Sequence, residues 1–139
     1  MATIAEAYVS FEVAKLLKEK GFPQDPYMCN TAYTMRGKLS NNAKSFISPC
    51  NVIGLTRSYA IAPTQQMAMR WLREEHNISI EISSCCKIAN CEPVDLGWAA
   101  RKIDLTKMVG SAFLIGRYDT YEMACEAAIK YCLENLNLI

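Results

Sequence analysis

APTQQMAMRWLREEHNISIEI, residues 62–82, decides the fold because a helix pattern passes there directly into a strand pattern. Pro63 suits the first helical turn, where its missing N–H would have no partner. Met67 and Trp71 lie four residues apart, so their side chains share one apolar stripe. Along Ile78–Ile82, isoleucine alternates with serine and glutamate, which is the period of a half-buried strand. The stretch therefore predicts an amphipathic helix that leads straight into a strand.

The first and last helices are indicated by signals at their ends. Ser10 is the expected N-cap of a helix over residues 11–20, and Gly21 follows where a left-handed terminator is wanted. Asp119, with Glu122 three residues later, forms a capping-box pattern that predicts the start of the last helix. Asn77 plays the corresponding terminating role for the central helix.

The strands are less sharply defined by the sequence. Ala112–Tyr118 reads as a strand, as does a tyrosine- and threonine-containing segment that ends at Gly37. Residues 39–51 are polar and favour a loop, and residues 51–62 favour a short strand before the central helix. The pieces KIA and WAARKIDL of residues 83–111 are strand-like. That segment is too long for a plain hairpin loop, so it is expected to add structure or carry a binding surface.

Together these elements predict one α+β domain spanning residues 1–139, with three main helices packed on one face of a small, mainly antiparallel sheet. Ile78–Ile82 and Ala112–Tyr118 are expected as neighbouring strands. Residues 83–111 would form a structured excursion between them, including one helical turn capped by Asp104.

Size and composition exclude several classes of protein. The chain has 139 residues, of which 51% are hydrophobic, enough for a core of its own. A net charge of +1 argues against a generally basic nucleic-acid coat. The first residues lack a signal-peptide pattern, and the longest apolar run, residues 108–116, is too short to cross a bilayer. We therefore expect a cytoplasmic protein with no membrane contact. Its seven cysteines are expected to be reduced thiols, with a secreted disulfide framework as the alternative.

Charge is one-sided in the first half of the chain. Residues 26–73 contain no acidic residue, three tyrosines and six cations, namely Arg36, Lys38, Lys44, Arg57, Arg70 and Arg73. The stretch also includes the N-terminus of the central helix, where free N–H groups favour anions. One interpretation is a pocket for a phosphate-bearing ligand, or a groove for a short nucleic acid stacked on the tyrosines. The other is a solvated basic face, since no glycine-rich phosphate loop is present.

Trp98 lies close to Arg101 and Lys102 in the later segment. An aromatic face beside cations suits a nucleobase or an acidic partner. The alternative is that the indole simply covers the core.

Patterns that would indicate metal binding or catalysis are lacking in the sequence. A metal site would have to use His76, Cys85, Cys86 and Cys91, which lack the paired C-x-x-C spacing of a zinc site. A cysteine nucleophile would have only His76 as its base. No Walker, G-x-G-x-x-G, H-E-x-x-H or G-x-S-x-G motif occurs. We expect no catalytic residues, no metal and no cofactor.

Three segments carry a resemblance to a protein family: SFEVAKLLKEKGF near the start, YAIAPTQQMAMRWLREEHNISIEI in the middle and YDTYEMACEAAIKYCLENL at the end. They resemble small uncharacterised accessory proteins of phages, prophages and mobile elements of gut Bacteroidetes. The resemblance carries over no catalytic residue. It implies an accessory protein made inside a bacterial host, and such proteins often bind a host defence protein or a nucleotide messenger.

Our leading hypothesis is a non-enzymatic, phage-type counter-defence protein that sequesters a small anionic, nucleotide-like host signal, as a homo-oligomer. The expected ligand-binding residues are Arg36, Lys38, Arg57, Tyr59, Trp98 and Arg101. One alternative is an inhibitor or adaptor that acts on a host protein through residues 83–111 and the last helix. Another is a single-stranded nucleic-acid binder, whose affinity would fall steeply with salt.

Overall fold

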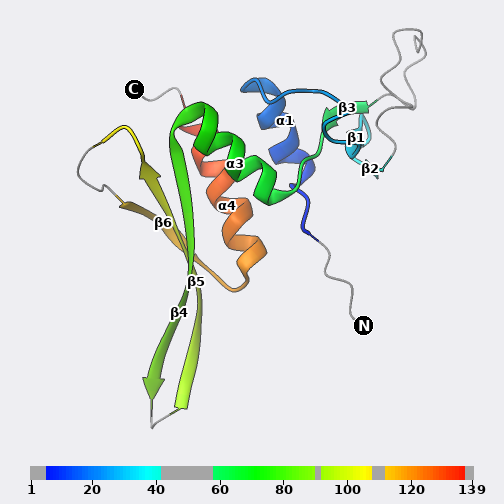
Figure 1. Cartoon of the computed structure of the whole chain (residues 1–139). Helices are drawn as coiled ribbons and strands as arrows, with labels where there is room; N and C mark the ends of the chain where they lie inside the picture. The colour runs from blue at the N-terminus through cyan, green and yellow to red at the C-terminus, as the bar shows by residue number, and fades with distance from the viewer. Residues whose placement is uncertain (1–5, 42–57, 90–91, 108–111, 137–139) are drawn as a thin grey trace, which may run out of the picture. The chain divides into compact units, whose positions relative to one another are not determined.

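Helices and antiparallel strands contribute about equally to the protein. The structure is a computed structural model that describes residues 6–41, 58–89, 92–107 and 112–136. Within these ranges it contains three helices and two three-stranded antiparallel sheets (Figure 1), which confirms the α+β class. The strands thus divide between two sheets instead of forming one. None of the described helices has the length and apolar character needed to cross a bilayer.

The chain divides into two compact units, residues 1–68 and 69–139. The boundary falls within helix α3 (Gln65–His76), so one continuous helix belongs to both units. The expectation of a single domain stays a prediction.

Helix α1 (Phe11–Glu19) of the first unit begins and ends where the sequence predicts. The Ser10 hydroxyl oxygen accepts a hydrogen bond from the Val13 N–H at 3.2 Å, which satisfies one of the free donors of the first turn. Gly21 has φ +98°, and the Phe22 N–H then bonds back to the Leu17 carbonyl at 2.9 Å. Leu17 is fully buried, so the amphipathic pattern of this helix forms part of the core.

The sheet of the first unit has the order β2-β1-β3, with β1 (Ala32–Thr34) between β2 (Leu39–Ser40) and β3 (Ser58–Ile61). The predicted strand ends at Thr34 rather than Gly37, because the chain reverses through a tight turn in which Gly37 has φ +79°. The first two residues of the predicted polar loop therefore return as β2.

Helix α3 confirms the helix predicted from the spacing of Met67 and Trp71. Its first helical residue is Gln65, two after Pro63, and Thr64 Oγ1 accepts a hydrogen bond from the Met67 N–H at 3.2 Å. Asn77 has φ 56° and ends the helix, as predicted. Strand β4 (Ile78–Ala89) begins at the next residue.

The sheet of the second unit corrects the predicted strand order. Strand β5 (Glu92–Asp104) pairs with β4 on one side and with β6 (Ala112–Tyr118) on the other. Ile78–Ile82 and Ala112–Tyr118 are therefore not neighbours, because the segment predicted as an excursion supplies the middle strand. Among the described residues, β6 pairs with Trp98–Ile103 alone, so β4 and β5 continue beyond it as a two-stranded ribbon (Figure 1).

Helix α4 (Tyr121–Glu134) packs on one face of this sheet (Figure 1). The contact is built from small residues, Ala124 and Ala128 of the helix and Ala100 of β5, all fully buried. Small side chains let the helix and strand backbones approach closely, and larger side chains then pack around them. The N-cap of α4 is Thr120, not Asp119, because Thr120 Oγ1 accepts the hydrogen bond from the Met123 N–H.

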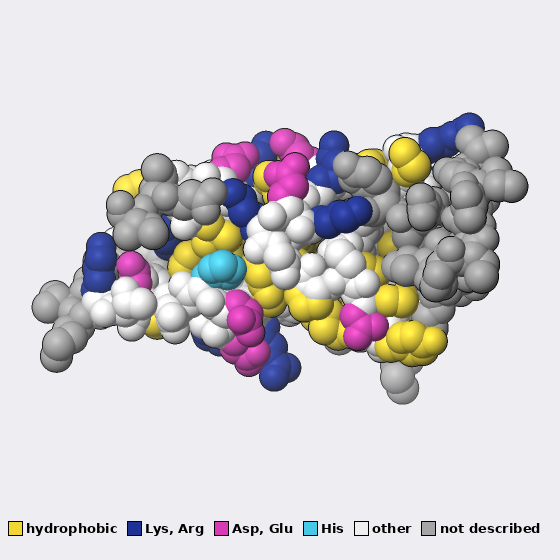
Figure 2. Space-filling view, turned by 90° about the horizontal axis from the view of Figure 1, so that it is seen from above, with side chains coloured by type: hydrophobic (Ala, Val, Ile, Leu, Met, Phe, Trp, Pro, Cys, Tyr) yellow, Lys and Arg dark blue, Asp and Glu magenta, His cyan; other side chains and the backbone are white. Residues whose placement is uncertain are grey.

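The surface carries charges of both signs. In Figure 2, dark blue Lys and Arg side chains and magenta Asp and Glu side chains are both exposed among the described residues. On α3, for example, Arg70 Nε lies 2.9 Å from Glu74 Oε1 one helical turn away. One of the cations of residues 26–73 is thus paired on its own helix.

Candidate ligand pocket

A pocket of about 310 Å³ lies in the second unit, at the end of the sheet where β5 finishes. Its lining comes from β5, the turn after it, β6 and α4. The lining residues are Lys102, Asp104, Lys107, Phe113 and Tyr131.

The strand period explains why polar residues reach this position. Side chains alternate between the two faces of a strand, so Lys102 and Asp104 of β5 share the face of Ala100. Ala100 packs against α4 in the core, whereas the next two positions on that face are charged. The same face of β5 therefore changes from core to pocket lining over four residues.

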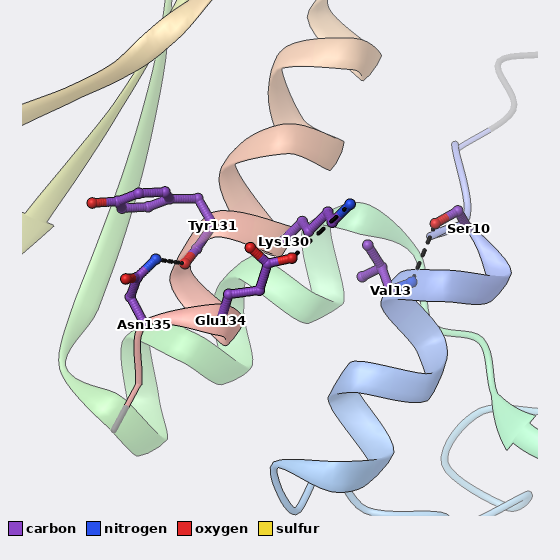
Figure 3. Close-up of polar contacts among 6 residues, drawn as sticks. All are labelled: Ser10, Val13, Lys130, Tyr131, Glu134 and Asn135. Carbon is purple, nitrogen blue, oxygen red and sulfur yellow. Dashed lines mark hydrogen bonds and ion pairs between the residues drawn. The ribbon is translucent and has the colours of Figure 1, made fainter. Parts of the chain in front are cut away.

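The aromatic part of the pocket is a stacked pair. The rings of Phe113 and Tyr131 have centroids 5.7 Å apart and planes inclined by only 15°. Phe113 lies opposite Lys102 in the β5–β6 register and is 54% exposed, so an exposed aromatic side chain lies beside a cation. Figure 3 shows the Tyr131 side chain leaving α4 toward the strands, while Lys130 leaves the helix in another direction and lies 4.0 Å from Glu134.

The C-terminal end of α4 is fixed close to Tyr131. The Asn135 side-chain Nδ2 donates to the Tyr131 carbonyl at 2.7 Å (Figure 3). Asn135 is also the C-cap, and its backbone N–H bonds to carbonyls of the last turn. These bonds satisfy acceptors that the helix end would otherwise leave free, and they hold the residue that carries the aromatic ring.

Asp104 is held in a turn and remains ionised. Its Oδ1 accepts a hydrogen bond from the Thr106 hydroxyl at 2.6 Å and another from the Thr106 N–H at 2.9 Å. These two bonds, followed by the charges of Lys107 and Lys102, lower the pKa of the Asp104 carboxyl. The predicted helical turn capped by Asp104 is therefore a short side-chain-stabilised turn. The pocket lining carries two positive charges and one negative charge at neutral pH.

Cys132 follows the pocket residue Tyr131 in the chain and is fully buried. Burial raises the pKa of its thiol to about 11, although the charge of Lys102 acts in the opposite direction. The thiol is therefore protonated at neutral pH and is a core group, not a thiolate nucleophile.

The predicted binding residues of the first half are placed as follows. Arg36 and Lys38 are both exposed in the β1–β2 turn of the first unit. Tyr59 belongs to β3 of the same unit. Arg57 lies outside the described residues. A binding role for these residues stays a prediction.

Trp98 and Arg101 belong to the second unit and point to opposite faces of its sheet. Trp98 packs on the α4 side, with its ring edge-on to Tyr121 at 5.3 Å, which confirms the interpretation that the indole covers the core. Arg101 lies three positions further along β5, and its Nη1 donates to Ser83 Oγ at 2.7 Å. The two side chains therefore do not form one aromatic and cationic contact. Lys102, four positions from Trp98, is the cation on the same face.

None of the five pocket residues was among the predicted binding residues: Lys102 was noted only as a neighbour of Trp98, and Asp104, Lys107, Phe113 and Tyr131 were missed as binding candidates. The alternation of side chains along β5 could have shown that Lys102 and Arg101 lie on opposite faces of the sheet. The contact between Phe113 of β6 and Tyr131 of α4 depends on strand register and helix packing, which no local sequence pattern reveals. Among the described residues, no group of three or more His, Cys, Asp or Glu side chains could hold a metal ion. Comparison of the chain with protein-family models, with curated proteins and with solved structures finds no match.

Proposed function

We propose that this chain is a non-enzymatic binding protein for a small anionic ligand with a planar ring, of the nucleotide-like kind. The observation that carries the proposal is the combination of two lysines with an exposed aromatic side chain in one pocket. Lys102 and Lys107 supply the positive charge, and Phe113, stacked on Tyr131, supplies the ring.

Each part of the pocket has a physical role in this proposal. An ammonium group is a strongly hydrated point charge with three donors, which suits a phosphate or carboxylate of variable orientation. Stacking of a base on an aromatic side chain contributes roughly 1–3 kcal/mol and tolerates different bases. A volume of about 310 Å³ is at the lower end of the range of small-molecule sites, which favours one ring system with one anionic group.

The biological setting implied by the resemblance is counter-defence. A protein that captures a nucleotide-like host signal stoichiometrically lowers its free concentration without chemistry. This role needs affinity and abundance but no catalytic residue, which agrees with the lack of a recognisable catalytic motif in the sequence.

Calorimetric titration with nucleoside monophosphates tests the proposal directly. We expect saturable binding that weakens with salt, because the charge contacts are exposed to solvent. Replacing both pocket lysines (Lys102→Gln with Lys107→Gln) should weaken binding at least tenfold, and Phe113→Ala should weaken it further. The matched control is Lys130→Gln, which removes a lysine of the same unit that is paired with Glu134 and does not line the pocket. Failure of every nucleotide to give heat or a thermal shift, or equal losses in the pocket and control variants, would refute the proposal.

A second candidate, binding to a host protein, is favoured by the ribbon in which β4 and β5 run beyond β6. Leu96 on this ribbon is 46% exposed, whereas Trp98 is packed on α4. Leu96→Ser is therefore the better interface variant, because Trp98→Ala would disturb the core. Loss of a captured host partner in Leu96→Ser with unchanged nucleotide binding would support this function, and unchanged capture would count against it.

A further inference from the structure

Asp104 is an anomaly in a pocket proposed to bind an anion. It is an ionised carboxylate, yet it lines the same space as Lys102 and Lys107. A ligand that was purely anionic would be repelled by this group. A ligand that fits the whole pocket should bring N–H donors to the side where Asp104 lies.

The turn leaves part of the carboxylate available. Both hydrogen bonds from Thr106 end on Oδ1 of Asp104. A carboxylate has about four acceptor positions, two on each oxygen. Oδ2 takes part in neither of the Thr106 bonds, so it remains an acceptor for N–H donors of a ligand. The turn also holds the side chain in place, which reduces the entropy lost when a ligand binds.

The chemistry of the common bases distinguishes among possible ligands. Guanine presents two adjacent donors on one edge, N1–H and the N2 amino group. Adenine and cytosine present an amino group beside a ring nitrogen whose lone pair would face the carboxylate, and uracil presents a single N–H between two carbonyl oxygens. Only the guanine edge places two donors, with no acceptor between them, against a carboxylate.

We propose that the pocket selects a guanine-type mononucleotide, and that Asp104 is the residue that determines this specificity. The base stacks on Phe113 with its N1–H and N2–H directed at Asp104, and the phosphate lies between Lys102 and Lys107. This inference rests on the proposed function, because it assigns the ligand class of the same pocket. Carboxylate recognition of base donors is the kind of contact that discriminates between bases in other settings.

The test compares GMP, IMP and AMP by calorimetric titration with the full chain. These ligands share one phosphate and one ribose and differ only in the base edge. We expect GMP to bind roughly tenfold more tightly than AMP, with IMP, which keeps N1–H but lacks the amino group, between them.

The diagnostic variant is Asp104→Asn. Its amide oxygen still accepts from Thr106, while the amide NH₂ replaces Oδ2 by a donor, so the preference for GMP over AMP should disappear or reverse. The matched control is Thr106→Val, which removes the 2.6 Å hydroxyl bond but keeps the carboxylate. Thr106→Val should retain the GMP preference even if the turn is less stable.

The possible outcomes separate the two proposals. GMP and AMP affinities within twofold of each other would overturn the role of Asp104 and leave the proposed function intact. The same loss of base preference in Thr106→Val as in Asp104→Asn would also overturn it, because Asp104 would then act only through the turn. No binding of any nucleotide would overturn both.

Discussion

Gly97→Ala should destabilise the protein through two effects that add at this one position. Gly97 has φ +90°, a conformation that costs a residue with a Cβ about 1–2 kcal/mol. A Cβ at Gly97 would also lie 2.5 Å from the carbonyl oxygen of Tyr118, a backbone atom that cannot move without shifting β6. Such overpacking costs about 1–3 kcal/mol. After an offset of about 0.5–1 kcal/mol from the stiffer unfolded chain, the expected loss of unfolding free energy is about 1–4 kcal/mol.

The position matters because it is a bulge at the edge of the three-stranded part of the sheet. Between the pairs Ser84↔Trp98 and Cys86↔Asp95, two residues of β5 oppose one of β4. The bulge therefore lies where the ribbon begins and where β6 ends against β5.

Other glycines of the chain separate the two effects. Gly21 has φ +98°, but a Cβ there would meet nothing within 4 Å, so Gly21→Ala tests the conformational cost alone and should lose about 1 kcal/mol. At Gly116 the Cβ would be 2.8 Å from the Tyr118 hydroxyl and 3.1 Å from the ring carbon that carries it, so Gly116→Ala should cost less than Gly97→Ala because a side chain and not the backbone has to move. Gly97→Asn should recover part of the conformational cost, because asparagine tolerates positive φ, while keeping the clash.

Urea unfolding monitored by far-ultraviolet circular dichroism and tryptophan fluorescence gives the free energies. The expected order of destabilisation is Gly97→Ala, then Gly97→Asn, then Gly21→Ala, and Gly116→Ala should lose less than Gly97→Ala. Should Gly97→Ala fail to fold in buffer, unfolding in the presence of a stabilising osmolyte gives its place in the series. A loss at Gly97 no larger than the loss at Gly21 would refute the close approach of β5 to the Tyr118 carbonyl.

Three further changes test a cap, the core and a buried thiol. Thr120→Ala removes the acceptor of the Met123 N–H bond and should cost about 1 kcal/mol in urea unfolding, more than Asp119→Ala. Leu133→Ala empties a fully buried position and should cost about 2–5 kcal/mol in the same assay; a loss below that range would show that the site collapses around the smaller side chain. Because the pKa of Cys132 rises from 9.0 to about 11, the native state keeps a proton that the unfolded chain releases above pH 9. Stability should therefore fall between about pH 9 and pH 11 by up to about 3 kcal/mol. An identical pH dependence in Cys132→Ala would contradict this assignment.

Local signals in the sequence were enough to find the helices. Ser10, Gly21 and Asn77 each act within one turn of their own backbone, through a side-chain acceptor or a positive φ. Asp119 was the wrong cap because two adjacent residues, Asp119 and Thr120, are both good N-cap types. The backbone dihedral angles decide whether the carboxylate of Asp119 or the hydroxyl of Thr120 reaches the free N–H groups of the first turn.

Only part of the middle strand β5 was predicted from the sequence, because its place in the sheet depends on pairing with strands elsewhere in the chain. β5 lies between β4 and β6 through contacts that neither its composition nor its period encodes. Asp104 was predicted from its residue type to cap one helical turn. Its carboxylate instead accepts hydrogen bonds from Thr106 within a short turn. The pocket was missed for the same reason as the strand order: Lys102 and Phe113 meet through register, and Tyr131 reaches them from a helix about twenty residues further along the chain.

Core and pocket are two ends of one contact between α4 and the sheet. Ala124 and Ala128 face Ala100 where the backbones approach, and Tyr131 and Lys102 follow on the same helix side and strand face where the space opens. A ligand in the pocket would touch both elements, so its binding should stabilise their association by RT ln(1 + [L]/Kd), about 2.7 kcal/mol at a hundredfold excess over Kd. Conversely, Ala128→Leu overpacks the core without reaching the ligand, and by displacing α4 it should weaken binding measured by calorimetry. Lower stability with unchanged affinity would show that the spacing of α4 from the sheet does not set the shape of the pocket.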